Sequence, residues 1–280
     1  MLMGPACIGM LVMSPVHALF GLHIVRRGLI FIDLAIAQIA ALGMALAIHS
    51  GKNPQSFEAH SYAVGFALLG ALLIALTRRR LPRVPHEAII GIIYVVASAW
   101  AIILLEPTPH GVEELRDILG GTLLFITQRE IINTAIIYAV ILFVMAILWK
   151  PISAMTLNSV NAPKGIKAII LDFVFYGLLG FVVASSVKVA GVFVVFTWLV
   201  MPAVASLLWI ESMVVAALLA IALGWLGSFI GLVFSQRWDW PTGSSIILWI
   251  GILVAVFYIA RLIIVPRNTD IDRHPKHRRQ

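Results

Sequence analysis

Long apolar runs are the feature that most constrains this chain. A helix needs about 20 mostly apolar residues to cross the hydrocarbon core of a bilayer, and runs of this kind occupy most of the 280 residues. The chain is 61% hydrophobic and 12% charged, whereas soluble domains are roughly 45–50% apolar and about 25% charged. We therefore predict an integral membrane protein, because almost nothing is left over to build a soluble domain.

The apolar runs predict an all-α fold, a polytopic membrane helical bundle of about eight or nine transmembrane helices. Each run ends at charged residues, proline, glycine or asparagine. Residues 1–265 are expected to form a single transmembrane domain, and residues 266–280 a basic cytoplasmic tail. The nine expected helices cover 4–24, 29–48, 61–77, 87–105, 133–149, 168–187, 191–209, 213–234 and 244–265.

The longest connection, 106–132, begins with acidic residues and contains the apolar patch DILGGTLLFI. About ten apolar residues are too few for a full span. The connection therefore predicts an interfacial or re-entrant element.

Lysine and arginine are unevenly distributed between the connections. Alternate connections place fifteen of the 20 Lys and Arg residues on one side. Because basic residues accumulate on the cytoplasmic side, the N-terminus is expected outside and the C-terminus inside. Arg26 and Arg27 are then orientation anchors at the cytoplasmic end of the first span. The net charge of +7 is interpreted as this bias, with the tail drawn to anionic lipid headgroups, and no nucleic-acid partner is expected.

Asp33 is the most unusual residue, since it lies inside the apolar stretch GLHIVRRGLIFIDLAIAQIAALG (21–43). An ionisable side chain within a membrane segment costs roughly 2.5–3.5 kcal/mol, so it requires a partner, water or a ligand. Two interpretations remain open. Asp33 faces a polar translocation path, or it pairs with Arg26 or Arg27 or reaches water at the headgroup level. His17 is a second candidate for the path, with a hydrogen-bonded packing role as its alternative.

Pro202 interrupts the apolar run VFVVFTWLVMPAVASLL (192–208). A proline removes one backbone hydrogen bond and often kinks a spanning helix, so Pro202 is a candidate helix kink or gate. The sequence contains no G-x-x-x-x-G-K-[ST] phosphate loop, so any ATP hydrolysis is expected on a separate chain. Neither a nucleophile with its base nor a zinc-type cluster is evident, so neither an enzymatic role nor a permanently bound cofactor is expected.

Several of these segments together resemble the zinc/manganese-type ABC transporter permeases. The stretch 21–43 resembles the family's first signature, in which an arginine pair precedes a helix that carries an aspartate, a histidine and then a glycine. LDFVFYGLLGFVVASSVKVAGVFVVFTWLVMPAVASLL (171–208) resembles the second signature, a helix pair joined at a glycine and closed by Pro-Ala. WDWPTGSSIILW (238–249) is similar to the entry of the final helix, and DILGGTLLFITQREI (117–131) to the Phe-Gly segment. The resemblance extends from about residue 4 to 265.

The resemblance implies a membrane permease that translocates a divalent metal ion across a bacterial cytoplasmic membrane. It also implies a cytoplasmic ABC ATPase, an extracytoplasmic metal-binding protein, and pairing with a second copy or with a sister permease. The loop TLNSVNAPKG (156–165) matches the place where the family docks its ATPase, with Ala162 and Gly165 as the family's alanine and glycine. In the family these two residues are four apart and follow a Phe-Asp pair. Here they are three apart and the aspartate is missing.

A second departure concerns the metal site. The family places an aspartate and a histidine four residues apart on one helix face, where an oxygen and a nitrogen bind one divalent ion. Here Gln38 stands at the histidine position, five residues after Asp33 and about 140° away around a regular helix. A π-bulge would be needed to bring the pair together.

Two hypotheses follow from this departure. The first is that the lost nitrogen ligand disfavours Zn²⁺ and favours harder ions such as Mn²⁺; zinc outcompeting manganese in a transport assay would contradict it. The second is that the chain is a stand-alone secondary transporter or channel that uses Asp33 as an ion or proton site. A neighbouring gene for a phosphate-loop ATPase would favour the importer over this alternative.

Overall fold

The computed structural model describes residues 3–54, 56–80, 85–107, 123–157 and 159–264, and every regular element in these ranges is helical. The predicted all-α bundle is therefore confirmed. The expected basic tail, 266–280, and most of the expected re-entrant connection lie outside the described residues. The elements are α1 (Met3–Arg27), α2 (Ile32–His49), α3 (Phe57–Arg80), α4 (His86–Leu105), the 3₁₀ turn η1 (Leu123–Phe125), α6 (Gln128–Ile147), α7 (Trp149–Thr156), α8 (Ile166–Ala190), α9 (Val192–Leu207), α10 (Met213–Trp238) and α11 (Thr242–Ile264).

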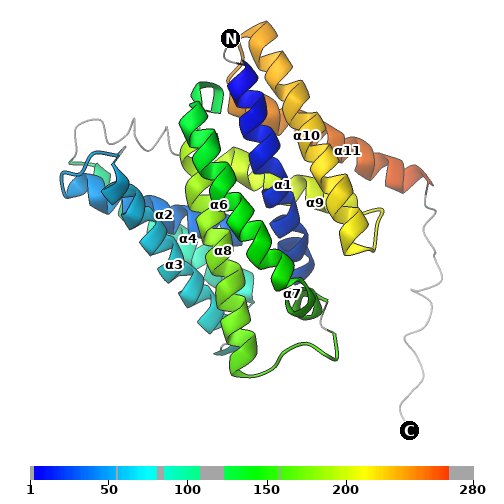
Figure 1. The fold of residues 1–280 in the computed structure, drawn as a ribbon, viewed down its shortest axis with the longest axis horizontal. Coiled ribbons are helices and arrows are strands. Elements are labelled where there is room, and N and C mark those ends of the chain that lie inside the picture. The colour runs from blue at the N-terminus through cyan, green and yellow to red at the C-terminus, as the bar shows by residue number, and fades with distance from the viewer. Residues whose placement is uncertain (1–2, 55, 81–84, 108–122, 158, 265–280) are drawn as a thin grey trace.

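The helices form two groups that α8 connects (Figure 1). In one group, α2 packs against both α3 and α4. In the other, α1 and α9 pack against each other and against α10, which also packs on α11. Because α8 contacts α2 and α3 as well as α9, it lies between the two groups.

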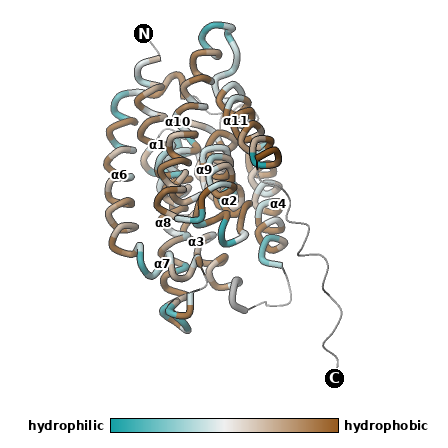
Figure 2. Tube along the Cα trace, turned by 90° about the vertical axis from the view of Figure 1, so that its right-hand side faces the viewer, coloured by the Kyte–Doolittle hydropathy of each residue, from teal (hydrophilic) through white to brown (hydrophobic). Residues whose placement is uncertain are grey.

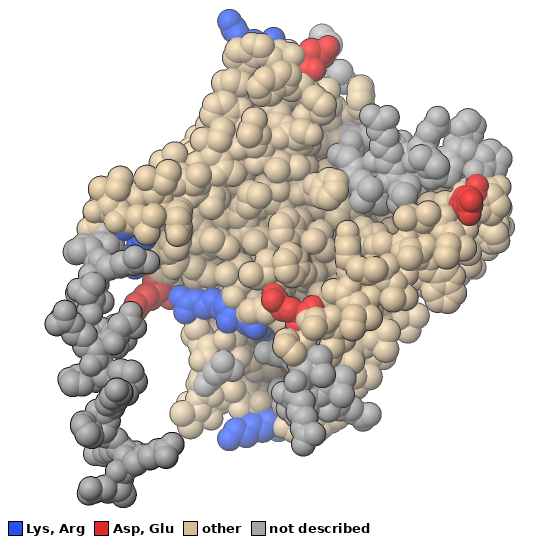
Figure 3. Space-filling view, turned by 180° about the vertical axis from the view of Figure 1, so that it is seen from behind, with Lys and Arg blue, Asp and Glu red and all other residues tan. Residues whose placement is uncertain are grey.

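Eight of the described helices are long and apolar enough to cross a membrane, and α9, with 16 residues, is shorter. Hydrophobic residues dominate the trace along the helices, and hydrophilic residues gather near their ends (Figure 2). One face of the molecule shows a broad area without acidic or basic side chains (Figure 3). Because lipid tails cannot hydrogen-bond, such a surface suits direct contact with hydrocarbon.

The helix ends fall at two opposite ends of the bundle, in the alternation expected from the sequence. At the end that carries Arg27, the Ile30 backbone N–H donates to Glu87 Oε1 over 3.0 Å, which joins the start of α2 to the start of α4. At the other end, His49 Nδ1 bonds the Leu104 carbonyl oxygen over 3.1 Å, which joins the ends of the same two helices. We refer to these as the inner and outer ends, following the predicted orientation.

Three helix boundaries differ from the expected ones for identifiable reasons. α2 begins at Ile32, because Gly28 has a φ of 66° and a turn separates it from α1. α6 begins at Gln128 and not near 133, since Thr127 and Glu130 form a reciprocal capping box. α7 was not expected: the expected helix 133–149 ended where α6 does to within two residues, and Leu148 then starts a separate short helix.

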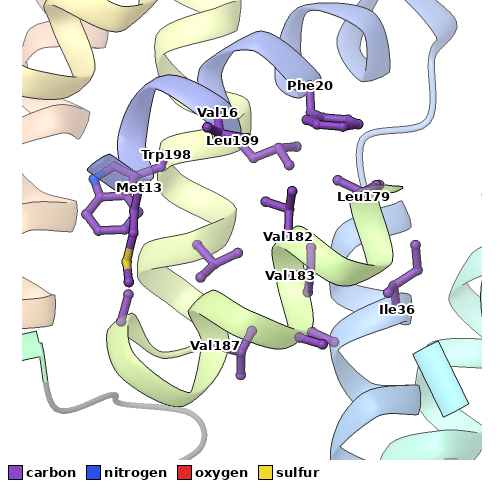
Figure 4. Close-up of a cluster of buried hydrophobic side chains, with 14 of the residues drawn as sticks. Met13, Val16, Phe20, Ile36, Leu179, Val182, Val183, Val187, Trp198 and Leu199 are labelled. Atoms are coloured by element: carbon purple, nitrogen blue, oxygen red, sulfur yellow. The ribbon is translucent and has the colours of Figure 1, made fainter. Parts of the chain in front are cut away.

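The core lies where α1, α8 and α9 meet (Figure 4). Trp198 is the largest fully buried side chain, and its Nε1 donates to Ser228 Oγ on α10 over 2.7 Å. Phe20 and Leu199 lie in the same cluster. Gly21 allows the close contact between the two helices, because a Cβ at this position would lie 1.7 Å from the Leu199 carbonyl oxygen.

Replacing Gly21 with alanine is therefore expected to separate α1 from α9. Backbone atoms cannot move aside as a flexible side chain can, so we expect a loss of about 3 kcal/mol or more. Thermal unfolding of the purified protein in detergent tests this, with Gly65→Ala as the control. Gly65 lies on α3 with no atom within 4 Å of its added Cβ, so alanine there should stabilise by up to about 1 kcal/mol. Equal melting temperatures for the two variants would contradict the packing argument.

Candidate functional site

Asp33 and Gln38 are both buried in α2, with side chains 1% and 4% exposed. α2 is regular from Ile32 to His49 and contains no π-bulge, so the two residues do not share a helix face. Asp33 lies in the first turn, where backbone N–H groups lack helical partners. Its Oδ1 atom has no hydrogen-bond partner within the described ranges. The carboxylate therefore has one oxygen whose hydrogen-bonding capacity is not used by the described residues.

His17 lies in the centre of the bundle and is fully buried. Its Nδ1 lies 2.8 Å from the Met13 carbonyl oxygen, and its Nε2 lies 3.0 Å from Ser186 Oγ on α8. A carbonyl only accepts, so Nδ1 carries a proton. The Ser186 hydroxyl, which contacts Nε2, also donates to the Val182 carbonyl oxygen of its own helix over 2.7 Å. Its ring packs against Tyr138 and Trp198. Because both ring nitrogens are engaged, this arrangement fits the packing role better than metal ligation.

The two arginines that were expected only as orientation anchors have specific partners at the inner end. Arg26 Nη2 donates to the Glu211 carbonyl oxygen over 2.6 Å, which ties α1 to the segment before α10. Arg27 forms an ion pair with Asp172 on α8, with Nη1 3.0 Å from Oδ1. Both side chains of this pair are at most 1% exposed. In the structure, Arg26 and Arg27 therefore contact Glu211 and Asp172, and neither contact involves Asp33.

Asp172 is the functional candidate that the sequence analysis missed. It stands in LDFVFYGLLG, an apolar segment that was used for the family resemblance. The rule that singled out Asp33, that an ionisable residue in a membrane segment needs a partner, applies equally to Asp172. The identity of its partner was not accessible, because Arg27 lies 145 residues away in sequence.

The loop between α7 and α8 presents apolar side chains to solvent at the inner end. Val160 is 91% exposed, and Leu157 and Ile166 are half to two-thirds exposed. The Ala162 backbone N–H donates to the Ser159 carbonyl oxygen over 2.9 Å, which forms a turn. Gly165 has a φ of 62° and precedes α8 directly, a conformation that favours glycine. Apolar side chains at the tip of an aqueous loop suit contact with another protein.

A cavity of about 740 Å³, lined by both polar and apolar side chains, opens at the outer end, between the starts of α3 and α6 and the end of α8. Two of its lining residues, Arg129 and Lys188, form no ion pair within the described part of the chain. Glu130 lines it too, but its carboxylate is engaged by Thr127 in the capping box. The remaining lining includes His60 and several hydroxyl and amide groups.

The cavity lies next to the polar groups that surround His17. Ser185 lines the cavity, and the next residue, Ser186, bonds His17. Tyr138 hydroxyl donates to the Val182 carbonyl oxygen over 3.3 Å, one turn before Ser185. Polar groups therefore continue from the outer cavity into the middle of the bundle.

Pro202 lies inside α9 and is buried. It faces α10 near Gly224, since a Cβ added to that glycine would lie 3.7 Å from Pro202 Cγ. Its expected role as a kink or gate stays a prediction. Among the described residues, no group of three or more His, Cys, Asp or Glu side chains could hold a metal ion.

The fold and these sites together define a polytopic helical membrane protein with a cavity at its outer end. The chain belongs to the ABC 3 transport family, whose model matches residues 1–263. The interpretation as an ABC transporter permease is therefore confirmed.

Relatives with known names support this assignment. The manganese transport system membrane protein MntC of Listeria innocua is 26% identical over 251 residues, covering 88% of this chain and 85% of that protein. A probable iron transport system membrane protein of Haemophilus influenzae is 25% identical over 218 residues, covering 77% and 76%. A structure titled PsaBC from Streptococcus pneumoniae in complex with Fab matches with a TM-score of 0.76 and 22% identity, covering 92% of this chain and 91% of that one. The last likeness concerns the fold.

The ion pair of Arg27 and Asp172 is expected to contribute strongly to stability. Asp172→Asn leaves the arginine buried without its counter-charge, which costs about 3–5 kcal/mol. The matched control is Glu58→Gln, which removes the exposed Lys52–Glu58 pair, 2.5 Å apart, and should leave the melting temperature unchanged because water screens it. Thermal unfolding in detergent measures both. A stability of Asp172→Asn equal to wild type would contradict the buried-pair interpretation.

Proposed function

We propose that the protein is the membrane subunit of an ABC importer that moves a divalent metal ion inward. Membership of the ABC 3 transport family supports this proposal, and so do the named manganese and iron transport relatives. The observation that carries it at residue level is Asp33, whose buried carboxylate keeps one oxygen without a hydrogen-bond partner among the described residues. A buried carboxylate of this kind is costly in a membrane unless it serves a ligand or a path.

The proposed ion is manganese-like rather than zinc-like. Gln38 supplies an amide oxygen where the family supplies an imidazole nitrogen, and it lies on another face of a regular helix. Oxygen ligands suit Mn²⁺, whereas Zn²⁺ prefers nitrogen or sulfur. Asp33 is thus the principal path residue, with Gln38 near the path and His17 in a supporting role.

The proposed partners follow from the two ends of the molecule. A separate cytoplasmic ATPase docks on the loop with Ala162 and Gly165, where exposed apolar side chains support a protein contact. An extracytoplasmic metal-binding protein delivers the ion to the outer cavity. The permease works as a dimer, with a second copy or with a sister permease. It resides in a bacterial cytoplasmic membrane, with the N-terminus outside and Arg26 and Arg27 at the cytoplasmic boundary.

Replacing Asp33 with asparagine tests the path. In vesicles that contain the permease, its candidate ATPase and its binding protein, we expect ATP-dependent Mn²⁺ uptake to fall about tenfold or more, since each 1.4 kcal/mol of lost ion stabilisation is a factor of ten. Asp239→Asn is the matched control, because Asp239 is exposed and has a φ of 56°, which asparagine also tolerates. Normal expression of both variants establishes that the fold is intact.

The outcomes separate the alternatives. Unchanged uptake in Asp33→Asn would make Asp33 a structural residue. Uptake by the permease alone, without ATPase or ATP, would favour the secondary transporter or channel. No uptake of either metal by the wild-type complex would mean that the cargo is not Mn²⁺ or Zn²⁺.

The hypothesis that the five-residue separation of Asp33 and Gln38 disfavours Zn²⁺ has its own test. Ala37 lies four residues after Asp33 and is 2% exposed, so Ala37→His places an imidazole on the face of the carboxylate. We expect this variant to raise Zn²⁺ uptake relative to Mn²⁺, whereas Gln38→His should not, because it stays on the other face. Competition between the two metals measures the preference, and size-exclusion chromatography checks folding. An equal gain in both variants would contradict the argument from the helix face.

A further inference from the structure

We propose that Arg27 is a positioning residue that couples the ATPase-docking segment to the two helices leading toward the outer cavity. This inference rests on the proposed function, because it takes the loop after α7 as the docking site. It goes beyond the expected role of Arg27, which was only to fix the orientation of the first span.

The contacts of Arg27 join three helices at one guanidinium. Nη1 donates to Asp172 Oδ1 on α8 over 3.0 Å, and Nε donates to Thr156 Oγ1 on α7 over 3.0 Å. Nη2 reaches the Ile152 carbonyl oxygen, also on α7, over 3.5 Å. The guanidinium carbon lies 4.3 Å from the centre of the Phe175 ring on α8. A planar group with five donors can hold all of these partners at once, which a lysine ammonium cannot do.

A second residue of α1 holds α7 from the same side. His23 Nδ1 lies 2.9 Å from Thr156 Oγ1, so the threonine hydroxyl contacts both His23 and Arg27. The His23 ring also packs against Trp149, the first residue of α7, with centroids 5.3 Å apart. α7 is thus fixed to α1 near both of its ends.

α7 directly precedes the proposed docking loop in the chain and carries two of the residues that Arg27 contacts. α7 has eight residues, and Leu148 is shared between its start and the end of α6. Its C-terminal end is followed by the exposed residues Leu157 and Val160 of the loop before α8. A force applied to this loop therefore acts first on α7, and then, through Arg27 and Thr156, on α1 and α8.

α1 and α8 extend from this attachment to the other functional regions. On α8, Asp172 and Ser186 are 14 residues apart, or roughly 21 Å along a helix. Ser186 bonds His17 of α1, and the adjacent Ser185 lines the outer cavity. The same two helices that Arg27 joins at the inner end are joined again in the centre of the bundle, below the cavity.

Thr156→Val tests the coupling, because valine has nearly the shape of threonine but lacks the hydroxyl that Arg27 and His23 contact. Its melting temperature in detergent is measured as well, since the change leaves buried polar groups without this partner. Arg27→Lys is the second variant, since it keeps the charge beside Asp172 but loses the fork that reaches α7. Thr197→Val is the matched control, because the Thr197 hydroxyl donates to the Phe193 carbonyl oxygen of its own helix and bonds no other described residue. The permease is reconstituted with its candidate ATPase and binding protein, and Mn²⁺ uptake and ATP hydrolysis are measured together.

If Arg27 couples the segments, both variants should lower the amount of Mn²⁺ transported per ATP hydrolysed by roughly two- to thirtyfold, the range for residues that modulate coupling between sites. The ATPase should still co-purify with both, and Thr197→Val should behave as wild type. A purely stabilising role predicts lower melting temperatures with an unchanged ratio of transport to hydrolysis, and that result would overturn the inference. Loss of ATPase binding in Thr156→Val and Arg27→Lys would overturn it too, by showing a docking defect.

The failure of the proposed function would look different. A wild-type permease that neither binds the ATPase nor transports metal would refute the proposed function before any variant is compared. A wild-type complex that transports, with variants that keep its ratio of transport to hydrolysis, would refute only the role of Arg27.

Discussion

The hydrocarbon core of a bilayer offers no hydrogen-bond partners, and the arrangement of this protein depends on that constraint. A polar side chain inside a spanning helix is costly unless it finds a partner on another helix, on its own backbone or in a ligand. His17 bonds Ser186, Trp198 bonds Ser228, and Arg27 pairs with Asp172. These contacts join α1 to α8 and α9 to α10, so the polar groups specify which helices are neighbours. Apolar packing alone would not distinguish one lipid-compatible neighbour from another.

The fold could be predicted from the sequence largely because the length of an apolar run is a direct physical requirement of the membrane. The helices expected to end at 24, 48 and 187 end in the structure at Arg27, His49 and Ala190. α7 was not predicted, because Lys150 and Pro151 end the preceding apolar run and an eight-residue helix is too short to give an apolar run of its own. The start of α6 could have been predicted, because TQRE at 127–130 matches the sequence pattern of a capping box.

The candidate site was less accessible than the fold. Asp33 was found from sequence because a carboxylate in an apolar run is conspicuous, and the structure places it buried in the first turn of α2. Its relation to the arginines was open, and only the three-dimensional contacts assign Arg27 to Asp172. Pairs separated by more than a hundred residues leave no local pattern, so a single sequence cannot identify them. The same reason applies to the outer cavity, whose lining comes from three helices far apart in the chain.

The basic side chains that line the outer cavity affect how free cations approach it. Arg129 and Lys188 line it without ion-pair partners in the part of the chain that the structure describes, and together they outnumber the carboxylate of Glu130. A positive potential in a hollow acts on a divalent cation with twice the force that it exerts on a monovalent one. Arg129 and Lys188 therefore disfavour a free divalent cation in the part of the cavity that they line. Delivery by a binding protein, as proposed above, would bring the ion to this cavity without its having to diffuse in as a free cation.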